Sequence, residues 1–229
     1  MKKHLAENGI TKTLIYSADA IFASDPAMPD KRLAAKLKKE KMFLHIPTVN
    51  PLYKNWMDIV KERNVNAVRV YPNYHKYSLL SEANCELAEY LAANNILYIV
   101  SMRLEDERSH HPSCMVTSLK TEELIEFAKK FPKLKILCLC AYYGEFELLL
   151  KLSQNIFADI SFAETNCTIE KISKYFPSDR IIFGSHTPFF YTAANVNKLK
   201  YANINSDVYE KIAENNAIGL LPELKQEIM

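Results

Sequence analysis

Several features that mark common classes of protein are scarce or missing in this 229-residue chain. It has only four glycines, with no G-x-G-x-x-G and no Walker-type loop. Dinucleotide and nucleoside triphosphate sites need backbone that approaches phosphate closely, so both are disfavoured. No apolar run approaches the roughly 20 residues that span a bilayer, and the N-terminus carries no secretory signal pattern. We therefore expect a cytoplasmic protein without a membrane partner.

The chain also lacks a large excess of either charge and any pattern of paired cysteines. The formal net charge is +2, and the lysines and arginines are spread along the chain, so we expect no nucleic-acid partner. The five cysteines form an odd, scattered set without C-x-x-C spacing, which is typical of reduced thiols rather than a disulfide framework. Hydrophobic residues make up 48% of the chain, enough for a sizeable core.

What the chain does contain is a series of short apolar runs that alternate with amphipathic stretches. Most runs are apolar at successive positions, which is typical of strands buried on both faces of a parallel sheet. They lie at Thr13–Tyr16, Phe43–Ile46, Ala67–Tyr71, Leu97–Val100, Ile136–Cys140, Phe157–Phe162 and Ile181–Phe183. Repeated βα units of this kind predict an α/β fold, and the missing phosphate loops favour a TIM-type (β/α) barrel. We expect one domain over residues 1–229, short of its first N-terminal strand.

The stretches between the runs carry helix signals. Thr121 is the predicted cap of one helix and Ser206 opens another, while Ser81 precedes a third. A helix-like piece, residues 2–8, comes before the first predicted strand.

Polar side chains gather after the third and fourth apolar runs, where a barrel of this type has its active site. Arg69, Tyr71 and His75 lie in R-V-Y-P-N-Y-H-K-Y, and a guanidinium there could hold a carboxylate through paired hydrogen bonds. A structured loop on the barrel rim explains these residues about as well. After the fourth run, M-R-L-E-D-E-R-S-H-H supplies Arg103 as a substrate anchor, Asp106 as a base and His110 as a binding group. The alternative is a surface loop with internal ion pairs.

Cys140 and His186 follow the fifth and seventh runs. Both residue types bind zinc or transfer protons, although a buried cysteine is more often a small core residue. No H-x-H occurs anywhere in the chain.

The order of these motifs resembles the amidohydrolase-related group of the amidohydrolase superfamily. The resemblance covers nearly the whole chain and includes A-V-R-V-Y-P-N-Y-H-K-Y, K-I-L-C-L-C-A-Y-Y-G-E and R-I-I-F-G-S-H-T-P, followed by E-K-I-A-E-N-N-A-I-G-L-L. It implies a TIM-barrel hydrolase or decarboxylase that acts on a small carboxylate-bearing substrate at the C-terminal mouth of the barrel. The alternative is a catalytically degenerate relative that binds a small anion or a protein partner without turnover.

The resemblance also implies a divalent metal such as zinc, yet the usual ligands are largely absent. The H-x-H strand is missing, and Ser101 stands where the family has a histidine. Cys140 or Ala141 stands where the family has another, and His186 replaces the aspartate of G-S-D-x-P. Only Cys140 and His186 remain as weak metal candidates, so we predict no tightly bound metal. His186 would then act as a metal-free base, oriented by Asp106, Asp159 or Glu164. Because a barrel lacking one strand has open edges, we also expect a homodimer or larger assembly.

Overall fold

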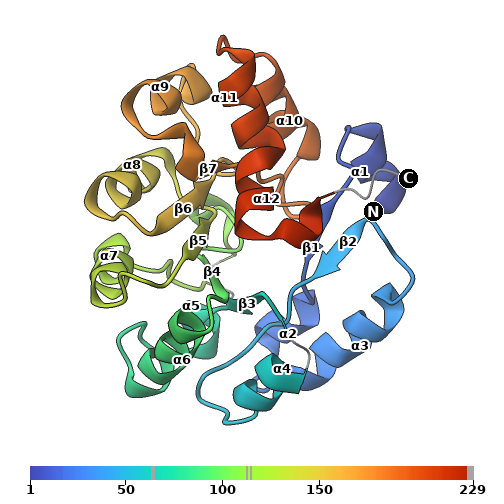
Figure 1. Ribbon diagram of the computed structural model, residues 1–229, viewed down its shortest axis with the longest axis vertical. Helices are drawn as coiled ribbons and strands as arrows, with labels where there is room; N and C mark the ends of the chain where they lie inside the picture. Colours follow the sequence, from blue (N-terminus) through green and yellow to red (C-terminus); the bar gives the residue numbers. More distant parts are fainter. Residues whose placement is uncertain (63–64, 112, 114, 226–229) are drawn as a thin grey trace.

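In the computed structural model of the chain, parallel strands form the centre and helices surround them (Figure 1). The structure describes residues 1–62, 65–111, 113 and 115–225, except for the side chains of Glu62 and Ser109; Cys114 lies outside the described residues. The strands are β1 (Thr13–Ile15), β2 (Phe43–His45), β3 (Ala67–Val70), β4 (Leu97–Ser101), β5 (Ile136–Leu139), β6 (Ile156–Asp159) and β7 (Ile181–Ile182). The predicted apolar runs are confirmed as strands within a few residues at each end.

The α-helices are α1 (Lys2–Glu7), α2 (Ala18–Phe22), α3 (Ala27–Leu37), α4 (Trp56–Glu62), α5 (Pro72–His75), α6 (Glu82–Ala93), α7 (Thr121–Lys130), α8 (Tyr143–Leu152), α9 (Thr168–Tyr175), α10 (Thr192–Lys200), α11 (Ser206–Glu210) and α12 (Asn216–Leu220). Shorter turns are η1 (Glu107–Ser109), η3 (Ser178–Arg180), η5 (Pro222–Leu224) and the π-helical η4 (Lys211–Asn215).

One predicted helix cap is wrong by one residue, because Thr121 is the first residue of α7 and Lys120 is its cap. The predicted start of a helix at Ser206 is confirmed for α11. The preceding residue, Asn205, is its cap, and its side chain accepts a hydrogen bond from the Val208 amide.

Two parallel sheets, β1–β2 and β3–β4–β5–β6–β7, are joined by the segment that follows β2. Arg69 donates its amide hydrogen to Pro47 O at 2.8 Å, and Val49 donates to Arg69 O at 2.9 Å. This ladder continues β2 alongside β3, so the seven strands follow one another in chain order. Such an order is that of a (β/α) barrel.

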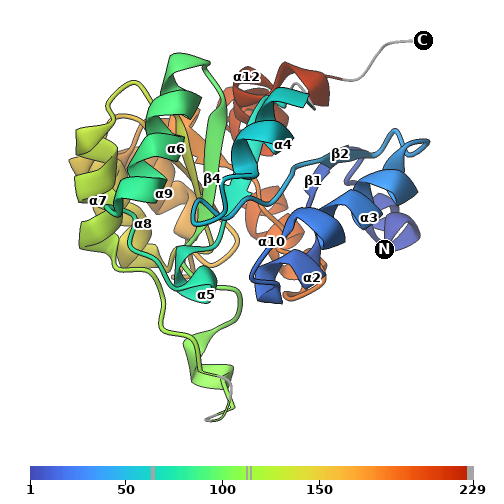
Figure 2. The same ribbon diagram turned by 90° about the horizontal axis from the view of Figure 1, so that it is seen from below.

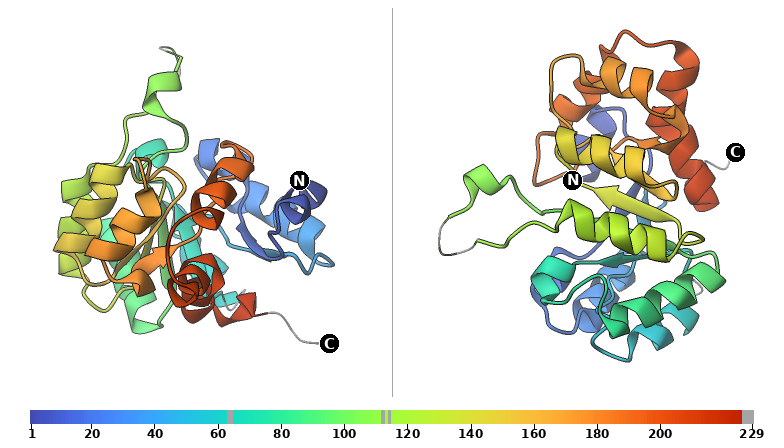
Figure 3. Two further views of the ribbon diagram at one scale, coloured as in Figure 1. Left: turned by 90° about the horizontal axis from the view of Figure 1, so that it is seen from above. Right: turned by 90° about the vertical axis from the view of Figure 1, so that its left-hand side faces the viewer.

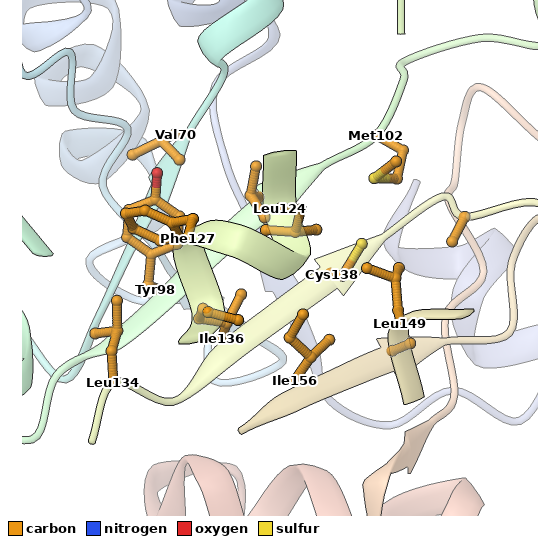
Figure 4. Close-up of a cluster of buried hydrophobic side chains, with 14 of the residues drawn as sticks. Val70, Tyr98, Met102, Leu124, Phe127, Leu134, Ile136, Cys138, Leu149 and Ile156 are labelled. Atoms are coloured by element: carbon orange, nitrogen blue, oxygen red, sulfur yellow. The ribbon is translucent and has the colours of Figure 1, made fainter. Parts of the chain in front are cut away.

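The outer face of the sheet forms the main core with the surrounding helices (Figure 4). Tyr98 on β4 packs against Phe127 on α7 with ring centroids 5.2 Å apart, and its hydroxyl donates to Asn84. Burial of each such ring stabilises the fold by about 1.5–3 kcal/mol. Because side chains alternate along a strand, residues of the other parity point into the barrel.

The inner face forms a second, smaller core. It includes Ile46, Ala67, Leu97, Ile99, Leu137 and Ile182, and Leu221 closes it from the C-terminal segment. Figure 2 shows α12 at one end of the barrel and the segment after β4 extending away at the other. The active-site end of the barrel is therefore the end from which this segment protrudes, since it follows the carboxyl end of a strand.

Among the described residues no ladder joins β7 to β1, so the barrel has a seam between them. Helix α1 spans the outside of this seam: His4 Nε2 lies 2.9 Å from Thr192 Oγ1 of α10, and Lys2 pairs with Glu40 at 2.7 Å. The left view in Figure 3 shows α1, in dark blue, at the edge of the molecule. None of the helices in the described part of the chain has the length and apolar character needed to cross a bilayer.

Candidate functional site

Polar side chains near the carboxyl ends of three strands point into the barrel. Arg69 is the third residue of β3, Ser101 ends β4 and Asp159 ends β6. Their exposed fractions are 1%, 1% and 3%. Each lies on the inward-facing parity of its strand, continuing the apolar inner core with hydrogen-bonding and charged groups. A buried polar cluster at this end of a barrel is where a (β/α) enzyme has its chemistry.

The guanidinium of Arg69 is held between two aromatic rings. Its central carbon lies 3.9 Å from the ring centroid of Tyr16 and 4.9 Å from that of Tyr71. Nη2 donates a hydrogen bond to Ser101 Oγ, whereas Nε has no hydrogen-bond partner. Among the described residues Arg69 forms no ion pair. A fully buried cation without a paired anion is costly, so this guanidinium is suited to receive one from a ligand.

Asp159 is the buried carboxylate of the cluster. Its Oδ1 accepts the amide hydrogen of Cys140 at 2.8 Å, and burial raises the pKa of its carboxyl above the ordinary value. Gly184 makes room for it, because a Cβ atom at that position would overlap Asp159 Oδ2. The arrangement gives a carboxyl group able to hold a proton more readily than an exposed one would.

His186 is buried, with 8% of its surface exposed, and both ring nitrogens are engaged. Nε2 lies 2.5 Å from Leu104 O, so this nitrogen carries the proton and donates it to the carbonyl. Nδ1 is then the acceptor for the Cys140 thiol, 3.2 Å away. Burial lowers the pKa of His186 to about 4 and raises the pKa of the Cys140 thiol to about 12, so both groups are neutral near pH 7.

The backbone holds this pair in an unusual conformation. Cys140 has φ 61° and His186 has φ 51°, both in the left-handed region that residues with a Cβ seldom adopt. Such conformations cost roughly 1–3 kcal/mol each and concentrate at functional sites. Two such residues in contact, one after β5 and one after β7 on either side of β6, support a role for this corner of the barrel.

Arg103 and Asp106 lie in the segment after β4, and both have protein partners. Arg103 is 2% exposed and binds Glu145 of α8 through both terminal nitrogens, at 2.5 and 2.7 Å. Asp106 accepts from Arg108 and from the Tyr142 hydroxyl, and the Arg108 guanidinium holds the pKa of its carboxyl well below the usual range. Neither the Arg103 guanidinium nor the Asp106 carboxylate contacts His186 in the structure.

Of the remaining predicted binding residues, Tyr71 contacts Arg69, His75 packs against Tyr71, and His110 lies in the segment after β4. Tyr71 is fully buried against Arg69, and its hydroxyl has no hydrogen-bond partner. His75 lies behind Tyr71, with Nε2 3.2 Å from Ala20 O, and burial lowers its pKa. His110 is half-buried in the segment that protrudes after β4.

The donors available do not fit the zinc that the sequence resemblance implies. A catalytic zinc commonly takes three protein ligands and a water. Cys140 and His186 supply two, and no group of three His, Cys, Asp or Glu side chains able to hold a metal ion occurs in the part of the chain that the structure describes. Absence of tightly bound zinc stays a prediction, which stoichiometric zinc in elemental analysis, lost in His186→Ala, would contradict.

A cavity of about 590 Å³ opens beside this cluster. Arg69, Asp159, Tyr16 and His186 line its polar end, and inner-core side chains line the rest. Its volume lies within the range of about 300–1,000 Å³ typical of small-molecule sites.

The sequence alone did not single out Tyr16 or Ser101 as binding residues, and it named Asp159 only as a group that orients His186. A usable signal was present in the alternation of β6, where Asp159 shares the inward parity of Phe157. What the sequence lacks is the strand register that sets Asp159 opposite Ile182 and close to Gly184.

No protein-family model and no curated protein matches the sequence. Solved structures do match. A 5-carboxyvanillate decarboxylase from Sphingomonas paucimobilis has a TM-score of 0.75 at 15% identity, over 96% of this chain and 82% of that one. A 2,6-dihydroxybenzoate decarboxylase from Rhizobium gives 0.72 at 14%, over 96% and 86%. An amidohydrolase from Mycobacterium avium subsp. paratuberculosis gives 0.66 at 15%, over 96% and 73%. The chain therefore shares the barrel fold of these solved structures, and the predicted TIM-type fold is confirmed.

Proposed function

We propose that the chain is an amidohydrolase-like enzyme, a decarboxylase or hydrolase, that acts on a small carboxylate-bearing substrate at the C-terminal mouth of the barrel. The observation that carries the proposal is the buried guanidinium of Arg69, which lines the cavity with an unpartnered Nε and without an ion pair. Arginine binds carboxylates in a planar, two-pronged geometry, so a substrate carboxylate would complete this site.

Asp159 and His186 are the proton-transfer groups of the proposed site. In decarboxylation the bond between the carboxylate carbon and its neighbour breaks, carbon dioxide leaves, and the neighbouring carbon takes a proton. Asp159 fits the role of donor because burial raises its pKa, and it faces the same cavity as Arg69. In hydrolysis a base must take a proton from water, and neutral His186 could do so once its hydrogen bond with the Cys140 thiol opens.

The solved relatives give independent support for the substrate class. One 5-carboxyvanillate decarboxylase was solved with manganese and 4-hydroxy-3-methoxy-5-nitrobenzoic acid, and one 2,6-dihydroxybenzoate decarboxylase was solved with 2,6-dihydroxybenzoate. Those ligands carry carboxylates. We carry over the carboxylate alone to this chain, since its donors do not fit a metal.

A second candidate function is binding without turnover. The specific observation in its favour is that both nitrogens of His186 are already engaged, by Leu104 O and by Cys140 Sγ. A site of this kind could hold a small anion on Arg69 while lacking a free base.

Isothermal titration with benzoate and its neutral isostere benzamide tests the anion site. We expect benzoate to bind, benzamide not to bind, and Arg69→Met to abolish benzoate binding. Arg108→Met, which removes an exposed guanidinium, serves as the control and should leave binding unchanged. Equal affinity for benzoate and benzamide would refute the proposal. A carboxylate panel assayed for carbon dioxide release then separates the enzyme from the binder, with Asp159→Asn expected to abolish turnover and retain binding.

We further propose that the chain is a single domain of a cytoplasmic protein and that it forms a homodimer. In the part of the chain that the structure describes, β1 pairs with β2 alone. Its other edge supports the dimer, because an unpaired edge favours association. A monomeric mass in light scattering would remove this expectation.

A further inference from the structure

The cavity beside Arg69 does not stop at the barrel mouth. It continues along the seam between β1 and β7 to the opposite end, where Ala217, Leu220 and Leu224 of the C-terminal segment line it. Leu97 and Ile99 line it along β4, and Ser101 of the same strand binds Arg69. The distance from Leu97 to Ser101 along a parallel strand is about 13 Å, so the cavity is elongated rather than confined to the mouth.

The apolar side chains along this seam lack some of the dispersion contacts that a filled barrel interior would give them. In TIM barrels, inward side chains normally fill the interior. Here Leu14, Leu137 and Leu139 border the cavity instead. Side chains around an unfilled space lose dispersion contacts, and an apolar ligand of matching shape would restore them.

The lining of the cavity changes from polar to mostly apolar along its length. The buried cation Arg69 lies at the mouth end, and its exposed fraction is only 1%. Leucine and alanine from α12 and η5 line most of the far end, where Lys12 donates hydrogen bonds through Nζ to Glu223 O and Lys225 O. Two further cations of the lining, Arg32 and Lys36, are exposed. A ligand with a carboxylate at one end and an extended apolar chain behind it matches both ends at once.

An added peptide strand fits the seam less well. Phe183, directly after β7, already donates its amide hydrogen to Ile212 O at 2.9 Å, so part of the β7 edge is occupied. Leu5 of α1 also lines the cavity from outside and is 2% exposed, which places a helix where the outer face of an added strand would lie.

We infer that the site takes amphiphilic carboxylates, such as medium-chain fatty acids, with the carboxylate on Arg69 and the apolar chain along the seam between β1 and β7. The inference rests on the proposed anion site at Arg69 and adds the chemical class of the substrate's other end. The chain of the ligand replaces contacts that a filled barrel would make internally.

Titration with decanoate, butanoate and 1-decanol, all below micelle-forming concentrations, tests the inference. We expect decanoate to bind at least about tenfold more tightly than butanoate, because each buried methylene adds favourable transfer free energy. Ala217→Trp fills the far end of the seam and should remove this advantage while leaving butanoate affinity unchanged. Asn215→Trp places the same bulky residue at an exposed position and should have no effect. Ala217→Leu, a smaller filler, should give a partial loss, which guards against misfolding of the tryptophan variant.

The outcomes separate the two proposals. If butanoate and decanoate bind equally in wild type and in Ala217→Trp, the seam does not hold the chain, while the anion site stands. If 1-decanol binds as well as decanoate and Arg69→Met changes neither, the seam takes apolar molecules without the carboxylate, which refutes both the inference and the anion site. If no carboxylate of either length binds, both proposals fail.

Discussion

His186 is expected to make the stability of the fold depend on pH. Burial lowers its pKa from about 6.5 to about 4, which means that the folded protein binds a proton there more weakly than the unfolded chain does. The contribution of neutral His186 to the free energy of unfolding is therefore fully present above pH 6.5, and it is lost as the pH falls toward 4. The full difference corresponds to about 3 kcal/mol, at ~1.4 kcal/mol for each tenfold change in proton affinity. At pH 5 about 2 kcal/mol of this should already be lost.

Urea denaturation at pH 7.5 and pH 5, followed by circular dichroism, measures this loss for wild type and His186→Asn. Asparagine does not titrate, so the variant should lose about 2 kcal/mol less stability between the two pH values. His75, whose pKa burial also lowers, contributes in the same direction in both proteins and cancels in the comparison. Identical losses in the two proteins would show that His186 is not buried in neutral form, and the hydrogen-bond arrangement with Cys140 and Leu104 O would then be wrong.

Three further predictions concern the supports of the site. Gly184→Ala should lower stability by roughly 1–3 kcal/mol because its Cβ overlaps a buried carboxylate, whereas Gly144→Ala, with open space around it in a helix, should be neutral or stabilising in the same thermal melts. Arg103→Met should cost about 1.5–3 kcal/mol in denaturant titration, since it removes charged hydrogen bonds and leaves the partly exposed Glu145 carboxylate without its partner; a loss under 1 kcal/mol would contradict this. Iodoacetamide at pH 8 should modify the exposed Cys167 and spare Cys140, whose thiol has a pKa of about 12; early modification of Cys140 in peptide mapping would show that its corner of the barrel opens.

The strands could be predicted because they are buried on both faces. In β3 and β4 every residue is buried, and the mostly apolar runs in the sequence reflect that. Strands β1 and β2 are only partly buried, since α3 covers one face and the seam leaves the other incomplete. The order of motifs predicted a barrel short of one strand, and among the described residues no ladder joins β7 to β1. The cavity along this seam was not predictable, because it depends on how α1 and α12 close the two sides of the seam.

The site was predicted only in part. The ends of strands can be recognised in a sequence, whereas the ion-pair and hydrogen-bond partners of the residues that follow them cannot. Asp106 was chosen as a base from its position after β4. Its actual partner, Arg108, is two residues away, and a carboxylate that close to an arginine readily pairs with it. Glu145, which binds Arg103, lies in the first turn of α8 and reaches back across the barrel rim, a contact that no local pattern shows.

The two buried arginines, Arg69 and Arg103, differ in how their positive charges are compensated. Removing a guanidinium from water costs several kcal/mol, and a paired carboxylate with additional hydrogen bonds offsets most of that cost. Arg103 has such a partner in Glu145 and a further acceptor in Cys140 O, so it stabilises the rim. Arg69 has a hydroxyl and two tyrosine faces, each a weaker partner than an anion. The fold therefore keeps one cation incompletely compensated at the mouth of a cavity, and an anionic ligand is the partner that would complete it.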